Sequence, residues 1–119
     1  MASPIDDPVK FYLNEVAKVP PLSVDEENAL FEKLRRHPDE AAERRLIEGR
    51  LALVVQIAER YASSGMPMLE LLQEGNCGLM KAVRQFAKKP SGEFSTYAST
   101  LIDEAIREAV AGWNQSNGG

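Results

Sequence analysis

A strip of polar and acidic side chains interrupts an otherwise apolar stretch that runs from Met68 to Phe86. Its members are Glu70, Gln73, Glu74 and Asn76, followed by Lys81. Spacings of three and four residues bring side chains onto one helix face, and a mostly acidic face suits a partner that presents basic helices. The alternative is a face that only meets water, as charged strips commonly do. Composition alone favours the solvated face.

Groups that could carry out catalysis or hold a metal ion are scarce. The sequence has neither a glycine-rich phosphate loop nor a nucleophile motif, and carboxylates scattered over exposed helix faces indicate no acid/base pair. His37 is the only histidine and Cys77 the only cysteine, so neither a zinc cluster nor an internal disulfide can form. We expect His37 in a solvated loop and Cys77 as a buried structural thiol. An enzyme or a metalloprotein is therefore not expected.

The net charge of the chain bears on nucleic-acid binding. It is -4, whereas binding through bulk electrostatics needs many Lys and Arg side chains against phosphates. Any contact must therefore be local. The candidate is a basic group with aromatic rings nearby, made of Lys81, Arg84, Lys88, Lys89, Phe86, Phe94 and Tyr97. Exposed rings stack on bases, but we expect Phe86 and Phe94, which lie near helix ends, to be core residues.

Length and composition indicate one cytoplasmic domain. The 119 residues, 44% hydrophobic and 27% charged, suffice for a single core. No apolar run approaches the roughly 20 residues that span a bilayer. The first seven residues lack the basic and apolar blocks of a secretion signal. Neither secretion nor insertion into a membrane is expected.

The N-terminal half reads as three helices. Pro8 opens a short amphipathic helix, and the pair Pro20-Pro21 ends it. The sequence Ser23-Val24-Asp25-Glu26 forms a capping box for a helix that should reach about Arg36. The longest helix is predicted from Pro38 to about Ser63, because no proline interrupts that stretch.

The C-terminal half reads as two helices and a tail. The first helix should run from Met68 to Phe86, and the second should be capped by Ser95 and stop near Gly112. Residues 114–119 have nothing to bury and are expected to form a flexible tail. The sequence thus predicts an all-α fold, a compact bundle of about five helices. Residues 1–22 are expected to form an N-terminal helix and turn, and residues 23–113 a helical domain. From residue 7 on, the two should make one structural unit.

Several segments, in order, resemble regions 1.2 and 2 of bacterial RNA polymerase sigma factors of the primary, housekeeping family. Asp7-Pro8-Val9-Lys10-Phe11-Tyr12-Leu13 is similar to the start of region 1.2. The stretch from Glu48 to Val54 is similar to the opening helix of region 2, and Leu69 to Val83 resembles the polymerase-binding helix almost residue for residue. Phe94-Ser95-Thr96-Tyr97-Ala98 resembles the start of the promoter helix. The likeness spans about residues 7–111.

The resemblance implies a role in transcription initiation without catalysis. A sigma factor joins core RNA polymerase, recognises the promoter and opens its Pribnow box by capturing flipped bases. By their position in the matching helix, the residues expected to contact the clamp helices of the largest polymerase subunit are Glu70, Gln73, Glu74, Asn76 and Met80. The resemblance therefore favours a partner-binding strip over a merely solvated one.

The helix that resembles the promoter helix departs from the family pattern. Where the family has two tryptophans this chain has Thr100 and Leu101, and Asp103 and Glu104 replace an arginine and a glutamine. Base capture needs aromatic platforms and cations, and carboxylates repel phosphates. Promoter contact is therefore expected to be weakened or altered. The candidates that remain for DNA contact are Lys81, Arg84, Lys88, Lys89, Phe94, Tyr97 and Arg107.

Three functional hypotheses follow from these residues. The first is a sigma-like initiation module that binds core polymerase with weakened promoter contact. The second is a sigma mimic or regulator that occupies the clamp helices without binding or melting promoter DNA, which the acidic last helix favours. The third is a helical scaffold that has lost both contacts. None of them involves a cofactor, a metal ion or a membrane.

Overall fold

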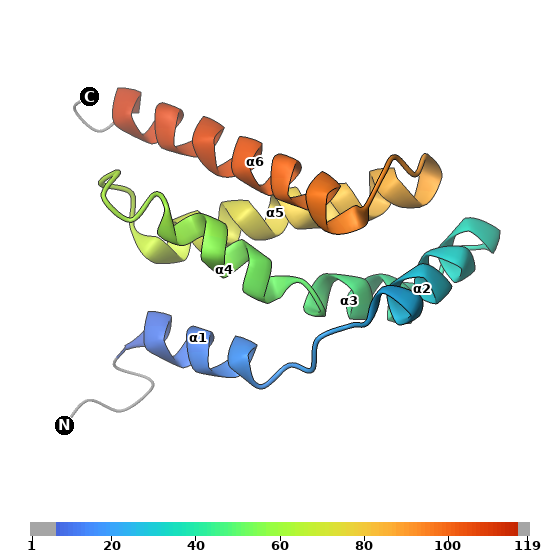
Figure 1. The fold of residues 1–119 in the computed structure, drawn as a ribbon. Coiled ribbons are helices and arrows are strands. Elements are labelled where there is room, and N and C mark those ends of the chain that lie inside the picture. Colours follow the sequence, from blue (N-terminus) through green and yellow to red (C-terminus); the bar gives the residue numbers. More distant parts are fainter. Residues whose placement is uncertain (1–6, 117–119) are drawn as a thin grey trace.

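The computed structural model describes residues 7–116, which form six helices and contain no strand (Figure 1). The all-α class predicted from the sequence is confirmed, with six helices where about five were expected. The helices are α1 (Pro8–Ala17), α2 (Val24–Arg36), α3 (Glu40–Glu48), α4 (Leu51–Glu59), α5 (Met68–Lys88) and α6 (Phe94–Ser116).

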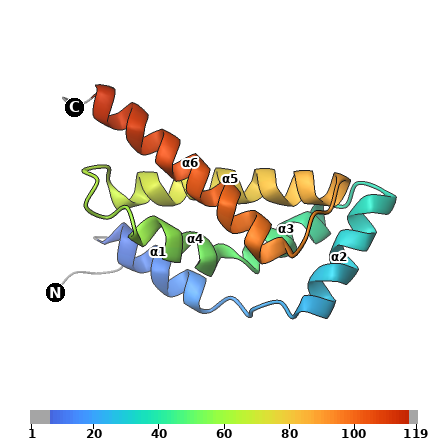
Figure 2. The same ribbon diagram turned by 45° about the horizontal axis from the view of Figure 1, so that its top comes forward.

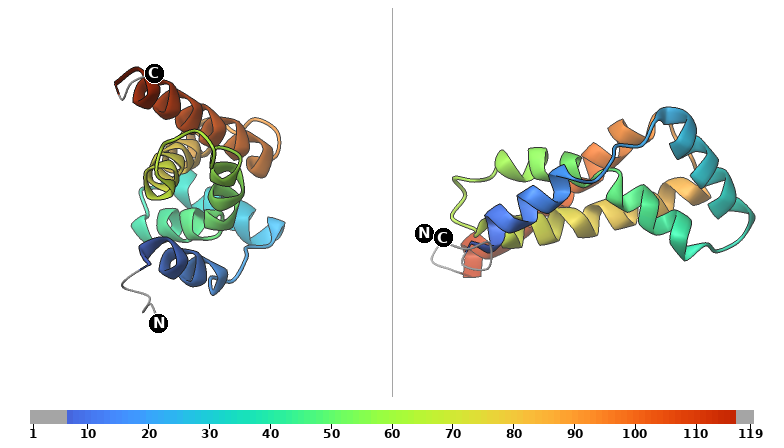
Figure 3. Two further views of the ribbon diagram at one scale, coloured as in Figure 1. Left: turned by 90° about the vertical axis from the view of Figure 1, so that its left-hand side faces the viewer. Right: turned by 90° about the horizontal axis from the view of Figure 1, so that it is seen from below.

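The two long C-terminal helices pack along each other and organise the bundle. In the ribbon views, α4 and α5 lie between α6 on one side and α1 on the other (Figures 1 and 3). Figure 2 shows α6 crossing α5 obliquely, with α2 at the far end of the molecule. The central helix α5 therefore contacts both the N-terminal and the C-terminal parts of the chain.

The predicted signals at the starts of α1 and α2 are confirmed. The Asp7 carboxylate accepts a hydrogen bond from the backbone N–H of Lys10 at 3.1 Å. The Ser23 hydroxyl accepts one from the backbone N–H of Glu26 at 3.1 Å, and the Glu26 carboxylate accepts one from the Ser23 N–H at 3.0 Å. These bonds satisfy backbone donors that a helix leaves free at its first turn.

The single long helix expected from residue 38 to about 63 is wrong, because the chain breaks into α3 and α4 at Gly49 and Arg50. A Cβ atom at Gly49 would lie 2.7 Å from Leu22 Cδ1, so the linker before α2 packs into the space that this glycine leaves. The backbone of Arg50 departs from helical geometry (φ -122°, ψ 12°). Its guanidinium donates two hydrogen bonds, of 2.8 and 3.0 Å, to the Glu27 carboxylate of α2. Tertiary contacts thus override local helix propensity.

The limits expected for the last helix are also wrong. Ser95 lies inside α6, which begins at Phe94, and the Ser95 hydroxyl donates to the Glu93 carboxylate at 2.8 Å. At the other end the helix continues past Gly112, because Trp113 packs against the core and holds the next turn. Residues 114–116 are therefore helical, and the rest of the expected tail lies outside the described residues.

Three phenylalanines hold together the end of the bundle where α5 meets α2 and the start of α6. The rings of Phe31, Phe86 and Phe94 lie with centroids 4.9 to 5.2 Å apart in tilted and edge-on arrangements. All three are buried, Phe94 to 3% exposure. The prediction that Phe86 and Phe94 belong to the core is confirmed, and the cluster fixes the turn between α5 and α6.

Candidate functional site

The polar strip lies on the outer face of α5. Glu70 and Gln73 are exposed and Glu74 is half-buried, whereas the opposite face of the helix is buried through Leu71, Leu72, Gly75, Leu79 and Val83. Within residues 7–116, neither Glu70 nor Glu74 forms an ion pair or a side-chain hydrogen bond. The strip therefore presents free carboxylates to a partner or to water.

Asn76 and Met80 lie on the flank of α5 and are half-buried. The side-chain amide of Asn76 donates to the Tyr12 hydroxyl of α1 at 3.1 Å. Its Oδ1 atom is buried and has no hydrogen-bond partner among the described residues. Helical spacing groups Asn76 with the strip but gives no sign of its contact with Tyr12, because no local pattern links residues 64 positions apart.

Cys77 corrects another expectation, since it is exposed instead of buried. It follows Glu70, Gln73 and Glu74 at helical spacing on the solvent face of α5, where the apolar residues around it in sequence point the other way. With Lys81, Glu104 and Glu108 it lines a small hollow between α5 and α6.

The acidic residues of α6 have different surroundings. Asp103 accepts a hydrogen bond of 2.6 Å from the Tyr61 hydroxyl and one of 2.9 Å from Arg107. The bond to Asp103 raises the pKa of Tyr61, because it favours the protonated phenol. Asp103 therefore links α6 to the turn after α4, a role that sequence reasoning missed. Glu104, by contrast, forms no side-chain bond among the residues described.

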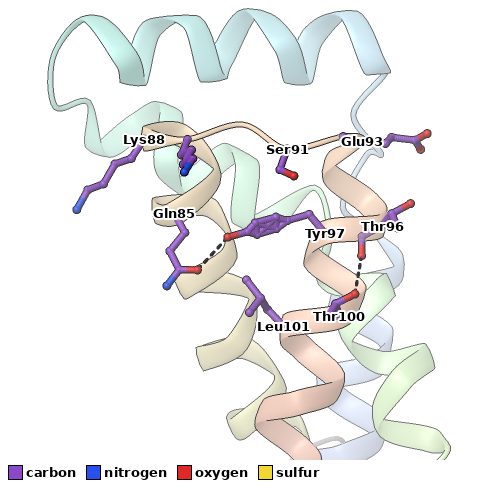
Figure 4. A pocket seen from close by; sticks show the side chains of 10 residues that line it. Gln85, Lys88, Ser91, Glu93, Thr96, Tyr97, Thr100 and Leu101 are labelled. Carbon is purple, nitrogen blue, oxygen red and sulfur yellow. Dashed lines mark hydrogen bonds between the residues drawn. The ribbon is translucent and has the colours of Figure 1, made fainter.

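A pocket of about 730 Å³ lies beside the start of α6, and Thr100 and Leu101 form part of its wall. It is lined by Gln85, Lys88, Lys89, Ser91, Gly92, Glu93, Thr96, Tyr97, Thr100 and Leu101. Figure 4 shows the Tyr97 ring extending toward Gln85, to which its hydroxyl donates at 2.9 Å. Thr100 is exposed, and its hydroxyl donates to the carbonyl oxygen of Thr96 in its own helix. No tryptophan lines this pocket.

The residues named as candidates for DNA contact separate into three groups. Lys81, Lys88 and Lys89 are exposed and form no ion pair in the described part of the chain. Arg84 is held by Glu43 at 3.1 Å, and Arg107 by Asp103. The Phe94 ring is buried and offers no face to a base, which leaves Tyr97 as the half-exposed ring. Phe94 is therefore a core residue and not a DNA contact.

The described residues contain neither a metal-binding cluster nor a membrane-spanning helix. Residues 7–116 contain no group of three or more His, Cys, Asp or Glu side chains that could hold a metal ion. Over the same range, no helix combines the length and the apolar character needed to cross a membrane.

Comparison with known proteins assigns the part of the chain that contains α4, α5 and α6 to a family. The family model described as Sigma-70 region 2 matches residues 46–113, more than half of the chain. The chain belongs to the sigma-70 family. A second model, Sigma-70 factor, region 1.2, matches residues 7–30, so the resemblance inferred from the sequence is confirmed for both regions.

Relatives within the sigma-70 family are similar over nearly the whole chain. RNA polymerase sigma factor SigA of Clostridium acetobutylicum is 50% identical over 107 residues, covering 90% of this chain and 28% of that protein. The SigA proteins of Lactococcus lactis subsp. cremoris and Listeria monocytogenes are 48% and 49% identical, again over 90% of this chain and over 30% and 28% of their own lengths. The chain thus spans less than a third of these sigma-70 relatives.

Side-chain contacts join the two sigma-70 regions in this structure. Arg50 of region 2 holds Glu27 of region 1.2, and Asn76 of region 2 donates to Tyr12 of region 1.2. These contacts connect region 1.2 to region 2, and the contact between Asn76 and Tyr12 lies at the candidate strip on α5.

Proposed function

We propose that this sigma-70 chain acts in transcription initiation by binding core RNA polymerase through the clamp helices of its largest subunit, with weakened contact to promoter DNA. The binding surface is the α5 strip, made of Glu70, Gln73, Glu74, Asn76 and Met80. The observation that carries the proposal is the pair of unpaired carboxylates, Glu70 and Glu74, on the exposed face of a helix within the matched region 2.

The surroundings of the strip support binding to another helix. Leu69, next to Glu70, is 41% exposed, although it is a large apolar side chain. Apolar and acidic side chains side by side on one helix suit a partner helix that offers both packing and basic residues. Such complementarity also speeds encounter and fixes register.

Reversing the charge at Glu74 should weaken polymerase binding. Glu74→Lys places a cation against basic partner residues, and we expect the dissociation constant for bacterial core RNA polymerase to rise roughly tenfold or more. Fluorescence anisotropy of the labelled chain measures it. The matched control is Glu48→Lys, the same charge change at an exposed residue that ends α3. Equal affinities of the two variants would contradict the proposal.

The weakened promoter contact rests on α6. Thr100 and Leu101 offer no aromatic platform, and Glu104 and Glu108 add carboxylates on the same helix. What remains for nucleic acid is the rim of the 730 Å³ pocket, with Lys88, Lys89 and Tyr97, and the exposed Lys81 earlier on α5. Three cations and one partly exposed ring supply few of the contacts that hold a single strand.

Returning an aromatic platform should restore part of the single-strand binding. Thr100→Trp combined with Glu104→Gln adds an exposed ring and removes a repulsive charge, while the Tyr61–Asp103 bond stays intact. One stacked base contributes about 1–3 kcal/mol, so we expect roughly tenfold tighter binding of a single-stranded Pribnow-box oligonucleotide. Glu104→Gln alone is the control, with a smaller expected gain. If the double variant binds no better than the control, α6 is not a weakened base-reading helix.

A second candidate function is a sigma mimic that occupies the clamp helices and leaves the promoter untouched. The carboxylates of Glu104 and Glu108 favour it, because they follow Thr100 at four-residue spacing on α6 and would repel phosphates near that face. Promoter transcription with a complete sigma factor distinguishes the two. A mimic lowers transcript yield as it is added and binds no oligonucleotide, whereas an initiation module also retains the oligonucleotide. A scaffold that has lost both contacts does neither.

A further inference from the structure

The 730 Å³ pocket between the end of α5 and the start of α6 has room for a bulky apolar group. Its surface is mainly apolar, although most of the residues that line it are polar. Figure 4 shows Tyr97, Thr100 and Leu101 on its α6 side. Clefts of about 300–1,000 Å³ with mostly apolar walls are typical binding sites in proteins.

Tyr97 forms a wall of the pocket that is held at two points. Its hydroxyl donates to the side-chain oxygen of Gln85 at 2.9 Å, and its ring packs edge-on against Phe86 with the ring centroids 5.4 Å apart. Phe86 in turn belongs to the buried phenylalanine cluster. A wall that is already ordered loses little side-chain entropy when a partner binds, so it favours binding.

The charges around the pocket are divided between two edges. Lys88 and Lys89, where α5 ends, are exposed and form no ion pair within the part of the chain that the structure describes. Glu93 lies just before α6 and is also exposed. In Figure 4, the side chains of Lys88 and Glu93 leave the pocket in opposite directions. One edge is therefore basic and the other acidic.

We propose that this pocket docks an acidic segment of a partner protein. The segment inserts a large apolar side chain beside Tyr97 and places its carboxylates next to Lys88 and Lys89. A peptide can hold its carboxylates at the basic edge and pass Glu93 with a neutral residue. A nucleic acid carries a phosphate at every nucleotide and brings negative charge past both edges, where Glu93 repels it.

The docked segment has a consequence that reaches beyond the proposed function. Lys88, Lys89 and Tyr97 are also the residues that remain for promoter DNA at this pocket. The segment and a single strand therefore exclude each other, and a partner that presents such a segment lowers whatever promoter contact the chain retains. Docking does not require the α5 strip, because the pocket lies at the other end of α5.

A synthetic peptide tests the docking directly. The probe is a fluorescein-labelled peptide in which aspartates flank a pair of leucines, titrated with the whole chain and followed by fluorescence anisotropy. We expect a dissociation constant on the order of 10–100 µM, which bulk charge cannot cause because the net charge of the chain is -4. Replacing the leucines by serines, or the aspartates by lysines, should weaken binding at least about tenfold. Equal binding of the three peptides, or none of the first, would overturn the proposal.

Charge reversal on the chain locates the binding site. Lys88→Glu and Lys89→Glu should each weaken peptide binding about fivefold, because each sets a carboxylate against the carboxylates of the peptide. Lys10→Glu is the matched control, at an exposed residue of α1, which Figure 1 shows on the side of the bundle away from α6. It should bind as the parent chain does, and circular dichroism verifies that all three variants remain folded. A loss for Lys10→Glu as large as for the other two would show that the peptide does not dock at the pocket.

Competition distinguishes the protein segment from nucleic acid. An unlabelled single-stranded Pribnow-box oligonucleotide should displace the labelled peptide only at concentrations about tenfold or more above those of the unlabelled peptide. Displacement by the oligonucleotide at lower concentrations than by the peptide would make the pocket a nucleic-acid site and overturn the proposal.

Discussion

Gly78→Ala is expected to lower the free energy of unfolding by about 2 kcal/mol, in spite of the higher helix propensity of alanine. A Cβ atom at Gly78 would lie 2.8 Å from the Leu101 carbonyl oxygen and 3.0 Å from both Ile102 Cα and Ala105 Cβ. Two of these atoms belong to the α6 backbone, so no rotation of a side chain relieves the clash. The helix α6 must move away from α5, and the packing of both helices suffers.

Gly112→Ala is the matched control, because a Cβ atom there meets nothing within 4 Å. This variant should be unchanged or more stable by up to about 1 kcal/mol, as alanine is favoured over glycine inside a helix. Urea unfolding followed by circular dichroism measures both variants. If Gly78→Ala is as stable as the parent chain, the close crossing of α5 and α6 does not limit the fold.

Arg50→Ala is expected to cost about 3 kcal/mol of unfolding free energy, because it leaves the Glu27 carboxylate buried and unpaired. Glu27 is 4% exposed, and Arg50 holds both of its oxygens at 2.8 and 3.0 Å. The carboxylate would then lose both of its charge-assisted hydrogen bonds at a site that gives water little access. The loss should also loosen α2, since this pair connects it to the start of α4.

Arg84→Ala provides the control for this second prediction. Arg84 forms the same kind of pair with Glu43, at 3.1 Å, but Arg84 is exposed and Glu43 is only half-buried. Such pairs contribute about 0 to 1 kcal/mol, so this variant should unfold close to the parent chain. The combination of Arg50→Leu with Glu27→Met should recover most of the stability that Arg50→Ala loses, because no charge is then left buried. Equal losses for Arg50→Ala and Arg84→Ala would show that burial of Glu27 carries little weight.

Local patterns in the sequence predicted much of this fold. The capping box at Ser23 and the apolar spacing in α1, α5 and α6 are properties of neighbouring residues, and each marks a helix that the structure contains. The same holds for the α5 strip, since spacings of three and four residues suffice to group Glu70, Gln73 and Glu74 on one face.

Features that depend on distant residues were out of reach of those patterns. The helix breaks at Gly49 because Leu22 fills the space beside that glycine and Glu27 binds the next residue, Arg50. Both partners precede α3 in the sequence. From the sequence, Asp103 was expected to repel DNA. In the structure it accepts a hydrogen bond from the Tyr61 hydroxyl, 42 positions away. The exposure of Cys77 depends on which face of α5 the other helices cover, which the apolar residues beside it in sequence do not disclose.

The contact between Glu27 and Arg50 also limits how the two sigma-70 regions can be exchanged. A chimera that joined this region 1.2 to a region 2 without arginine at position 50 would bury a carboxylate with no counter-ion. The reverse chimera would leave the guanidinium of Arg50 without its acceptor. We therefore expect a substitution at one of the two positions to destabilise such a chain unless the other position changes with it.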